Sequence, residues 1–167
     1  MVTEYKTVFT DAFGEITEKK SRFIAVIHHV ENEIEASDFI SLVKKEHWDA
    51  RHNCFAYVIG TDFPTERSSD DGEPSRTAGL PILEAVKGAG LTNVCIAVTR
   101  YFGGILLGTG PLAKAYRDSA GLAIANAGKI TVKLLSDIQL SIDYDLYGKL
   151  KFEADRLGLK VRSEEHT

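Results

Sequence analysis

The chain has 167 residues, of which 44% are hydrophobic and 26% charged, and its formal net charge is −4 at pH 7. This length allows one well-filled domain and a small second unit, and the balance of charge argues against a broad electrostatic nucleic-acid binder but leaves a local basic patch open. No apolar run of about 18 residues and no signal-peptide pattern occurs, so we expect a cytosolic protein with no membrane partner.

Strands and one helix are expected in the first part of the chain. Residues 5–9 and 14–30 read as two strands around a turn at 11–14. A capping-box pattern followed by an apolar stripe predicts a helix over 32–47. Trp48 is expected to close the core at the end of this helix.

A triplet of hydrogen-bonding residues, Arg51, His52 and Asn53, then leads into an apolar strand over 54–60. The triplet either faces a cleft or forms a satisfied turn, and one histidine is weak evidence for catalysis. Two cysteines, Cys54 and Cys95, lie in apolar runs without CxxC spacing. We interpret them as reduced core thiols.

An acidic loop follows at 68–81, with carboxylates at Asp70, Asp71 and Glu73. One interpretation is a cation site or a group that positions an arginine; the other is a solvated turn whose aspartates accept hydrogen bonds from backbone N–H groups. The spacing does not match a twelve-residue calcium loop, so we predict no metal. The loop ends where a helix begins near Thr77.

A glycine-rich stretch at 100–111 joins an apolar strand over 93–99 to a helical pattern that ends before Gly128. Backbone N–H groups at such a helix start attract anions, whereas the alternative is that the glycines only supply positive φ and close packing. Neither a Walker A loop nor a dinucleotide fingerprint is present. The candidate ligand- or anion-binding residues are Arg100, Tyr101, Phe102, Gly103, Gly104, Gly108, Thr109, Gly110 and Lys114.

The C-terminal part begins after a boundary at 136–137. Residues 138–142 and 158–162 are expected to form strands around a helix over 146–157. Such a unit cannot bury enough surface alone, so it packs on the first domain, pairs with another chain in an oligomer, or is the first half of a truncated domain. We therefore divide the chain into domains at 1–135 and 136–167.

Five motifs together resemble the YigZ/Impact family of uncharacterised conserved proteins and translation regulators. They are KSRFIA at 20–25, HNCFAY at 52–57, DDGEPS at 70–75, TAGLPIL at 77–83 and RYFGGILLGTG at 100–110. The resemblance spans roughly residues 5–130. In two places this sequence departs from the family pattern, because Arg76 stands where glycine is usual and Pro111 stands where a third glycine often follows.

The resemblance implies an α+β fold, a two-layer domain like the second domain of ribosomal protein S-five, with a mixed sheet and helices on one face. The alternation of strands and helices alone would also allow a parallel doubly wound sheet. For the C-terminal part the resemblance implies a partial, ferredoxin-like strand–helix–strand unit, and hence a shortened gene.

The function that the resemblance implies is that of a binding protein in translation, which contacts RNA, the ribosome or a regulatory protein through the glycine-rich turn. Phosphate would bind the N–H groups at 108–110 with Arg100 as a charged fork, and Tyr101 and Phe102 would either stack a base or pack in the core. The supporting residues are Asp70, Asp71, Glu73, Arg76, Thr77, Arg51, His52 and Asn53.

The alternative function is a small-molecule or nucleotide-dependent enzyme, a phosphotransferase or hydrolase, that uses the same cleft. Asp70, Asp71, Glu73 and His52 offer acid, base or metal-ligand groups. No kinase or hydrolase motif supports this alternative, so we assign no catalytic residue and expect no cofactor. A third possibility is a protein-docking module that binds a translation regulator.

Overall fold

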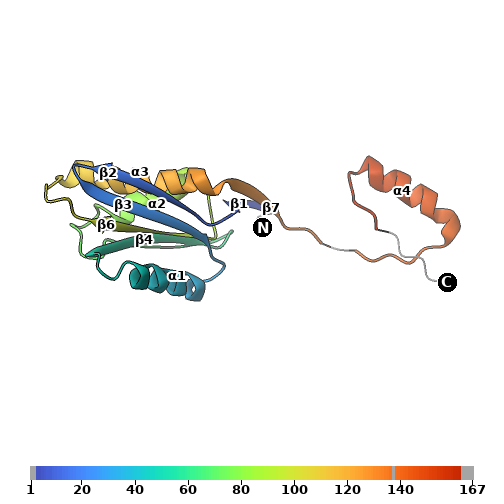
Figure 1. Ribbon diagram of the computed structural model, residues 1–167. Helices are drawn as coiled ribbons and strands as arrows, with labels where there is room; N and C mark the ends of the chain where they lie inside the picture. Colours follow the sequence, from blue (N-terminus) through green and yellow to red (C-terminus); the bar gives the residue numbers. More distant parts are fainter. Residues whose placement is uncertain (1–2, 137, 163–167) are drawn as a thin grey trace. The chain divides into compact units, whose positions relative to one another are not determined.

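The computed structural model describes residues 3–136 and 138–162, so Asp137 of the expected boundary and residues 163–167 lie outside the described part. The chain divides into two compact units, residues 1–134 and 135–167, which are described separately. The elements in chain order are β1 (Glu4–Val8), β2 (Ala12–Glu18), β3 (Ser21–His29), α1 (Glu33–Glu46), β4 (His52–Ile59), β5 (Thr65–Ser69), α2 (Gly79–Gly88), β6 (Val94–Tyr101), α3 (Thr109–Ala127), β7 (Lys129–Lys133), the 3-10 helix η1 (Tyr144–Leu146) and α4 (Tyr147–Arg156) (Figure 1).

A five-stranded sheet with the order β2-β3-β6-β4-β5 forms the centre of the larger unit, and β1 and β7 form a separate two-stranded sheet. Every strand pairing in the described part of the chain is antiparallel. The α+β class is confirmed, whereas the expected mixed sheet is corrected to an antiparallel one. The reason is that β2–β3 and β4–β5 follow each other through short connections, which only antiparallel neighbours allow.

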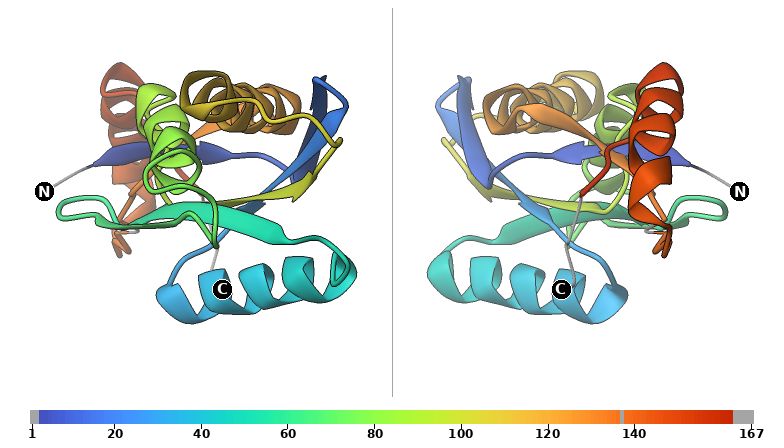
Figure 2. Two further views of the ribbon diagram at one scale, coloured as in Figure 1. Left: turned by 90° about the vertical axis from the view of Figure 1, so that its left-hand side faces the viewer. Right: turned by 90° about the vertical axis from the view of Figure 1, so that its right-hand side faces the viewer.

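Helices cover both faces of this sheet, which corrects the expectation of helices on one face. The main core joins α2 and α3 to one face, through residues such as Ala56 and Ile96. A second cluster, which includes Tyr57 and Cys95, lies with α1 on the other face (Figure 2). Because β4 and β6 are apolar on both faces, each face needs a cover.

The N-terminal strands also differ from the expectation. The segment expected as one strand over 14–30 is the hairpin β2–β3, in which Glu18 pairs with Ser21 across a turn at Lys19 and Lys20. Both turn residues have positive φ, 44° and 67°, as in the type I′ turns that fit the twist of a two-residue hairpin. Such turns usually contain Asn or Gly, so the sequence carries no signal for this one.

The smaller unit contains the expected helix, as α4, but not the expected strands. Residues 138–142 and 158–162 form no strand in the described part of the chain. A strand needs a neighbouring edge to satisfy its backbone groups, and these two segments do not pair. Apolar side chains of this unit, such as Ile138, Leu140 and Phe152, are exposed.

Candidate functional site

The predicted site residues gather at one end of the five-stranded sheet. In the register of β3, β6 and β4, Arg100 pairs with both Phe23 and His52, so the starts of β3 and β4 lie beside the end of β6. The glycine-rich segment leaves β6 at this end and enters α3, and the acidic loop reaches His52 and Asn53. The sheet thus brings the two unusual stretches of the sequence together.

A buried ion pair joins these two stretches. The Arg100 Nη1 atom lies 2.7 Å from Glu73 Oε1, and the exposed fractions of Arg100 and Glu73 are 7% and 9%. The Tyr116 hydroxyl donates a hydrogen bond of 2.7 Å to the same carboxylate oxygen. The acidic loop therefore faces Arg100, as expected, but the two form an internal contact.

The aromatic surroundings of Arg100 complete its burial. Its guanidinium carbon lies 5.5 Å from the ring centres of both Phe23 and Phe102. Its Nε atom has no hydrogen-bond partner among the described residues. Arg100 is therefore buried and paired with Glu73 inside the fold, and the phosphate-binding role expected from the sequence stays a prediction.

Asp70 caps helix α2 from a distance. Its carboxylate accepts hydrogen bonds from the backbone N–H groups of Arg76, Ala78 and Gly79, at 2.8–2.9 Å. Burial raises the pKa of Asp70, but these three hydrogen bonds outweigh burial and lower the pKa below its usual value of 3.8. Of the two interpretations of the acidic loop, the one in which aspartates accept hydrogen bonds from backbone N–H groups describes Asp70.

Asp71 is also engaged with its surroundings. Its carboxylate accepts hydrogen bonds from Lys44 Nζ at 2.8 Å and from the Asn53 backbone N–H at 2.7 Å. Burial raises its pKa, whereas the lysine and the backbone N–H lower it, and the net pKa is below 3.8. His52 Nδ1 lies 2.9 Å from the Asp71 carbonyl oxygen. The alternative of a satisfied turn therefore describes His52 and Asn53.

Two further residues of the acidic loop, Arg76 and Thr77, differ in their surroundings. Thr77 donates a hydrogen bond of 2.6 Å from its hydroxyl to the Pro74 carbonyl oxygen. Arg76 is exposed and has a φ of 65°, in the left-handed region that favours glycine. The departure from the family pattern at this position therefore places a strained residue in the loop.

The glycine-rich segment is anchored at one point and exposed beyond it. The Gly103 N–H donates to Ser21 Oγ at 3.1 Å, and a Cβ atom at Gly103 would lie 2.1–2.4 Å from backbone atoms of Lys20 and Ser21. This contact admits only glycine. Past it, Phe102, Ile105 and Leu106 have exposed fractions of 50%, 43% and 84%.

The remaining glycines lie in the exposed part of the segment, where the anion site stays a prediction. Gly104 and Gly108 have a φ of 83°, and Gly108 precedes α3 without a side-chain cap. Thr109 and Gly110 begin α3 in the exposed part of the segment, and no acidic residue lies in the first turn. Lys114, one turn further on, is exposed and forms an ion pair with Asp118. This helix start has the local charge that attracts anions.

Sequence reasoning missed three residues at this end of the sheet. Lys19 and Lys20 are exposed on the hairpin turn that packs against Gly103. Trp48 is 83% exposed, which corrects the expectation that it closes the core. The residues on either side of it, His47 and Asp49, hydrogen-bond the Tyr101 hydroxyl at 3.0 and 2.9 Å, so Trp48 lies beside the end of β6.

The two cysteines are buried and free. Burial raises the pKa of the Cys95 thiol to about 12 and raises that of Cys54 still further. Protonated buried thiols are unreactive, so both cysteines are core residues, as the sequence indicates.

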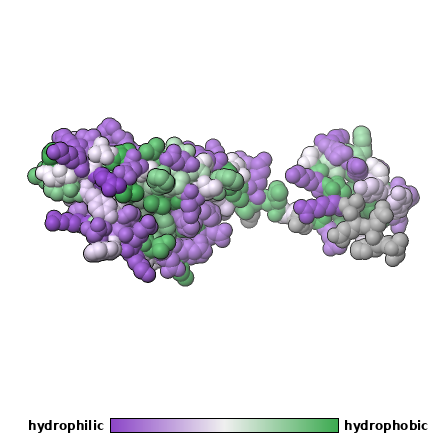
Figure 3. All heavy atoms as spheres, viewed as in Figure 1, coloured by the Kyte–Doolittle hydropathy of each residue, from purple (hydrophilic) through white to green (hydrophobic). Residues whose placement is uncertain are grey.

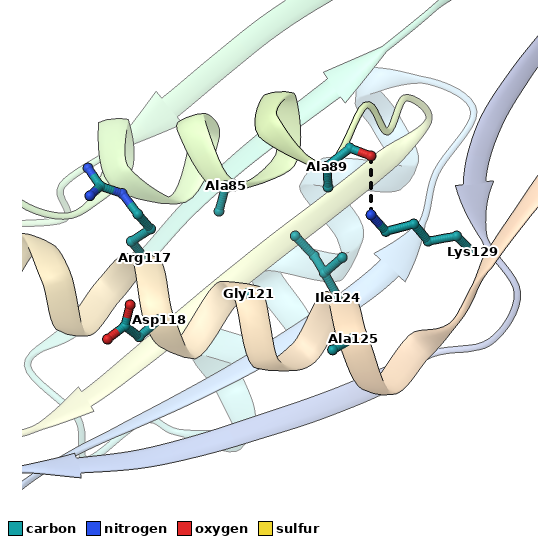
Figure 4. Close-up of a pocket in the computed structure, with 8 residues that line it drawn as sticks. All are labelled: Ala85, Ala89, Arg117, Asp118, Gly121, Ile124, Ala125 and Lys129. Carbon is teal, nitrogen blue, oxygen red and sulfur yellow. Dashed lines mark hydrogen bonds between the residues drawn. The ribbon is translucent and has the colours of Figure 1, made fainter.

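A shallow groove of about 570 Å³ lies apart from this site, between α2 and α3 (Figure 4). Small side chains such as Ala85 and Ala125 line it, and Lys129 Nζ donates to the Ala89 carbonyl oxygen at 3.3 Å. Arg117 lies at this groove and pairs with Glu84 at 2.9 Å.

In the described ranges, the His, Cys, Asp and Glu side chains form no group of three that would hold a metal ion. No helix among the described residues has the length and hydrophobicity needed to cross a membrane.

Comparisons with known proteins place the chain in one family. The model of the Impact N-terminal domain matches residues 19–124. The chain is 45% identical over 153 residues to the IMPACT family member YvyE of Bacillus subtilis, with 92% of this chain and 70% of YvyE covered. It is 41% identical over 128 residues to the IMPACT family member YigZ of Escherichia coli, with 75% and 63% covered.

A solved structure is also similar over the whole chain. The crystal structure of a hypothetical protein aligns with a TM-score of 0.77 and 32% identity, and covers 100% of this chain and 82% of that protein. The chain covers less than two thirds of the length of YigZ. Any activity of the full-length relative can therefore only be proposed for this chain.

Proposed function

Because the chain belongs to the Impact N-terminal domain family, we propose that it is a translation-associated binding protein that contacts RNA, the ribosome or a ribosome-associated regulator. The observation that carries the proposal is the exposed glycine-rich segment at the end of the sheet. Its apolar residues Phe102, Ile105 and Leu106 face solvent next to a helix start without a cap. Exposed apolar residues beside such a helix start are typical of an interaction surface.

The carboxylates of the enzyme alternative take part in contacts within the fold. The carboxylates that it requires are engaged by backbone N–H groups, by Lys44 and by Arg100. A general acid or base needs reach to a substrate, and these groups are committed to the fold.

Cosedimentation with ribosomes tests the proposal. The full chain is mixed with ribosomes and centrifuged through sucrose, and the bound fraction is compared with that of Leu106→Ser/Lys114→Ala. We expect the double variant to lose most of the bound fraction, because it removes an exposed apolar contact and a charge beside the helix start.

The matched control is Phe63→Ser, which removes a side chain that is 95% exposed in the loop between β4 and β5. The control is expected to sediment like the unaltered chain. Equal sedimentation of all three proteins would contradict the glycine-rich segment as the contact surface, and no sedimentation of the unaltered chain would contradict the ribosome as the partner.

A further inference from the structure

Two exposed aromatic side chains lie at the end of the sheet. Trp48 is 83% exposed and lies between two residues that hydrogen-bond the Tyr101 hydroxyl. Phe102 follows Tyr101 and is half exposed, with its inner side against Arg100. Because Tyr101 and Arg100 point to opposite faces of β6, the two aromatic rings lie on the two sides of the sheet end.

Three exposed cations lie at the same end of the sheet as these rings. Lys19, Lys20 and Arg51 are exposed and form no ion pair with another described residue. Arg22 and Lys114, by contrast, pair with Glu15 and Asp118. We name Lys19, Lys20, Trp48, Arg51 and Phe102 the aromatic rim.

Acidic residues limit the electrostatic field of the aromatic rim. Glu18 interacts with Lys114, and Glu46 and Asp49 interact with Tyr101. Figure 3 shows hydrophobic residues among the hydrophilic ones on the face that it draws, and its colours report hydropathy and not the sign of charge. Long-range attraction of a polyanion is therefore weak, and a ligand of this surface must gain its affinity from contact with the rings.

We propose that the aromatic rim binds single-stranded RNA, with bases stacked on Trp48 and Phe102 and phosphates beside Lys19, Lys20 and Arg51. This inference rests on the proposed function and names its ligand. Stacking on aromatic side chains tolerates every base and carries affinity where charge is limited. A duplex would offer no free base faces.

Tryptophan fluorescence tests this proposal directly, because Trp48 is the single tryptophan of the chain. The full chain is titrated with a twelve-nucleotide oligouridylate and with the corresponding DNA. We expect RNA to quench the fluorescence, because a stacked base contacts the indole. Equal or tighter binding of RNA than DNA supports the proposal, and tighter binding of DNA, or no quenching by RNA, overturns it.

The dependence on salt separates stacking from charge. If Lys19, Lys20 and Arg51 all contact phosphates, the slope of log affinity against log salt is about −2.1, so affinity falls about eighteenfold between 50 and 200 mM salt. A slope near zero would remove the lysines from the proposal. A slope steeper than about −4 would mean a polyelectrolyte surface elsewhere, which overturns the aromatic rim as the site.

The variant Lys19→Asn/Lys20→Gly removes both charges and supplies the residues that a type I′ turn favours, so the fold is expected to be retained. We expect a five- to tenfold loss of oligonucleotide affinity at low salt. The control Lys6→Asn/Lys133→Asn makes the same change of charge on the β1–β7 sheet, where Thr7 contacts His29 at the opposite end of β3. It is expected to lose less than twofold.

Trp48→Ala is measured by the anisotropy of a labelled oligonucleotide, and it is expected to lose about 5- to 100-fold in affinity. Leu106→Ser serves as the comparison and is expected to bind the oligonucleotide normally. If Leu106→Ser loses the oligonucleotide and Trp48→Ala does not, the aromatic rim is not the site.

The two proposals fail separately. Ribosome cosedimentation without any oligonucleotide binding would overturn the RNA ligand, point to a protein partner and leave the proposed function intact. Oligonucleotide binding without cosedimentation would support the aromatic rim as the RNA site and would contradict the ribosome as the partner of the chain.

Discussion

A single carboxylate at Asp70 replaces the missing N-cap side chain of helix α2. The residue at the N-cap position is Ala78, whose side chain makes no capping bond, and Asp70 accepts from the N–H groups of Ala78 and Gly79 instead. The negative charge also lies at the positive end of the helix dipole. The acidic loop therefore supplies the N-terminal cap of the helix that it precedes.

The pH dependence of stability follows from the lowered pKa of Asp70. A carboxyl group with a folded pKa below 3.8 adds stability above pH 3.8, and this contribution is lost as the pH falls through the folded pKa. We expect Asp70→Asn to cost about 1–2 kcal/mol at pH 7. The cost relative to the unaltered chain should shrink below pH 4, as measured by urea unfolding at both pH values. A cost that stays constant with pH would contradict the role of the charge.

The strained backbone at Arg76 gives a second prediction at this scale. Its φ of 65° costs roughly 1 kcal/mol for a residue with a side chain. We expect Arg76→Gly, which restores the residue usual in the family, to raise the free energy of unfolding by about 0.5–1 kcal/mol in urea titrations. The control Arg76→Ala keeps the strain and should bring no gain. Equal stability of both variants would show that the turn is unstrained.

For single residues, the sequence predicted hydrogen-bonding roles better than it predicted whether a side chain is buried or exposed. That aspartates in a Gly- and Pro-rich loop bond backbone N–H groups was one of two interpretations, because short carboxylates commonly do so. The exposure of Trp48 was not predictable, because tryptophan is usually buried and no local pattern reports which way a helix end faces.

Among the elements, the β2–β3 hairpin is held in an unfavourable turn. Lys19 and Lys20 both adopt positive φ, which costs energy for residues with a Cβ atom. We expect Lys19→Asn/Lys20→Gly to raise the free energy of unfolding by about 1 kcal/mol, measured by urea unfolding at neutral pH. Loss of stability in this variant would mean that the lysine side chains hold the turn through contacts of their own.

The elements with strong periodic patterns were predictable, and the irregular ones were not. The capping box of α1 forms as expected, because Asn32 accepts from the Glu35 N–H at 2.9 Å. The turn at Lys19–Lys20 and the polar strand β5 escaped prediction. The turn lacks the Asn or Gly that marks such hairpins, and β5 is a short, mostly polar strand that forms as the edge partner of β4.

In the whole molecule, one buried network ties the layers of the larger unit together. Glu73 from the acidic loop contacts Arg100 at the end of β6 and Tyr116 in α3. Both unusual loops of the sequence are thus fixed by the same carboxylate. Removal of this carboxylate leaves Arg100 buried and unpaired, which is the costly case for an internal charge.

We therefore expect Glu73→Gln to lower the free energy of unfolding by about 3–5 kcal/mol in urea unfolding. Tyr116→Phe, which keeps the ion pair and removes one hydrogen bond, should cost only about 1–3 kcal/mol. If the two variants cost the same, the ion pair adds nothing beyond the hydrogen bond.

For the whole molecule, the sequence predicted the α+β class and the meeting of the two loops. The family resemblance, not periodicity, carried most of this, since alternating strands and helices also fit a parallel sheet. The cover on both faces was implicit in the apolar strands β4 and β6. The buried ion pair between Arg100 and Glu73 could not be predicted from the sequence, because it depends on distances between side chains.

The contact between Gly103 and the hairpin turn has a consequence for folding. The Ser21 hydroxyl and the Gly103 N–H are 82 residues apart in the chain, so this contact is one of the long-range contacts of the fold. During synthesis, the end of the sheet cannot assemble before residue 103 has left the ribosome. The proposed binding surface is therefore incomplete in the nascent N-terminal half, and it forms only when nearly all of the larger unit is available to fold.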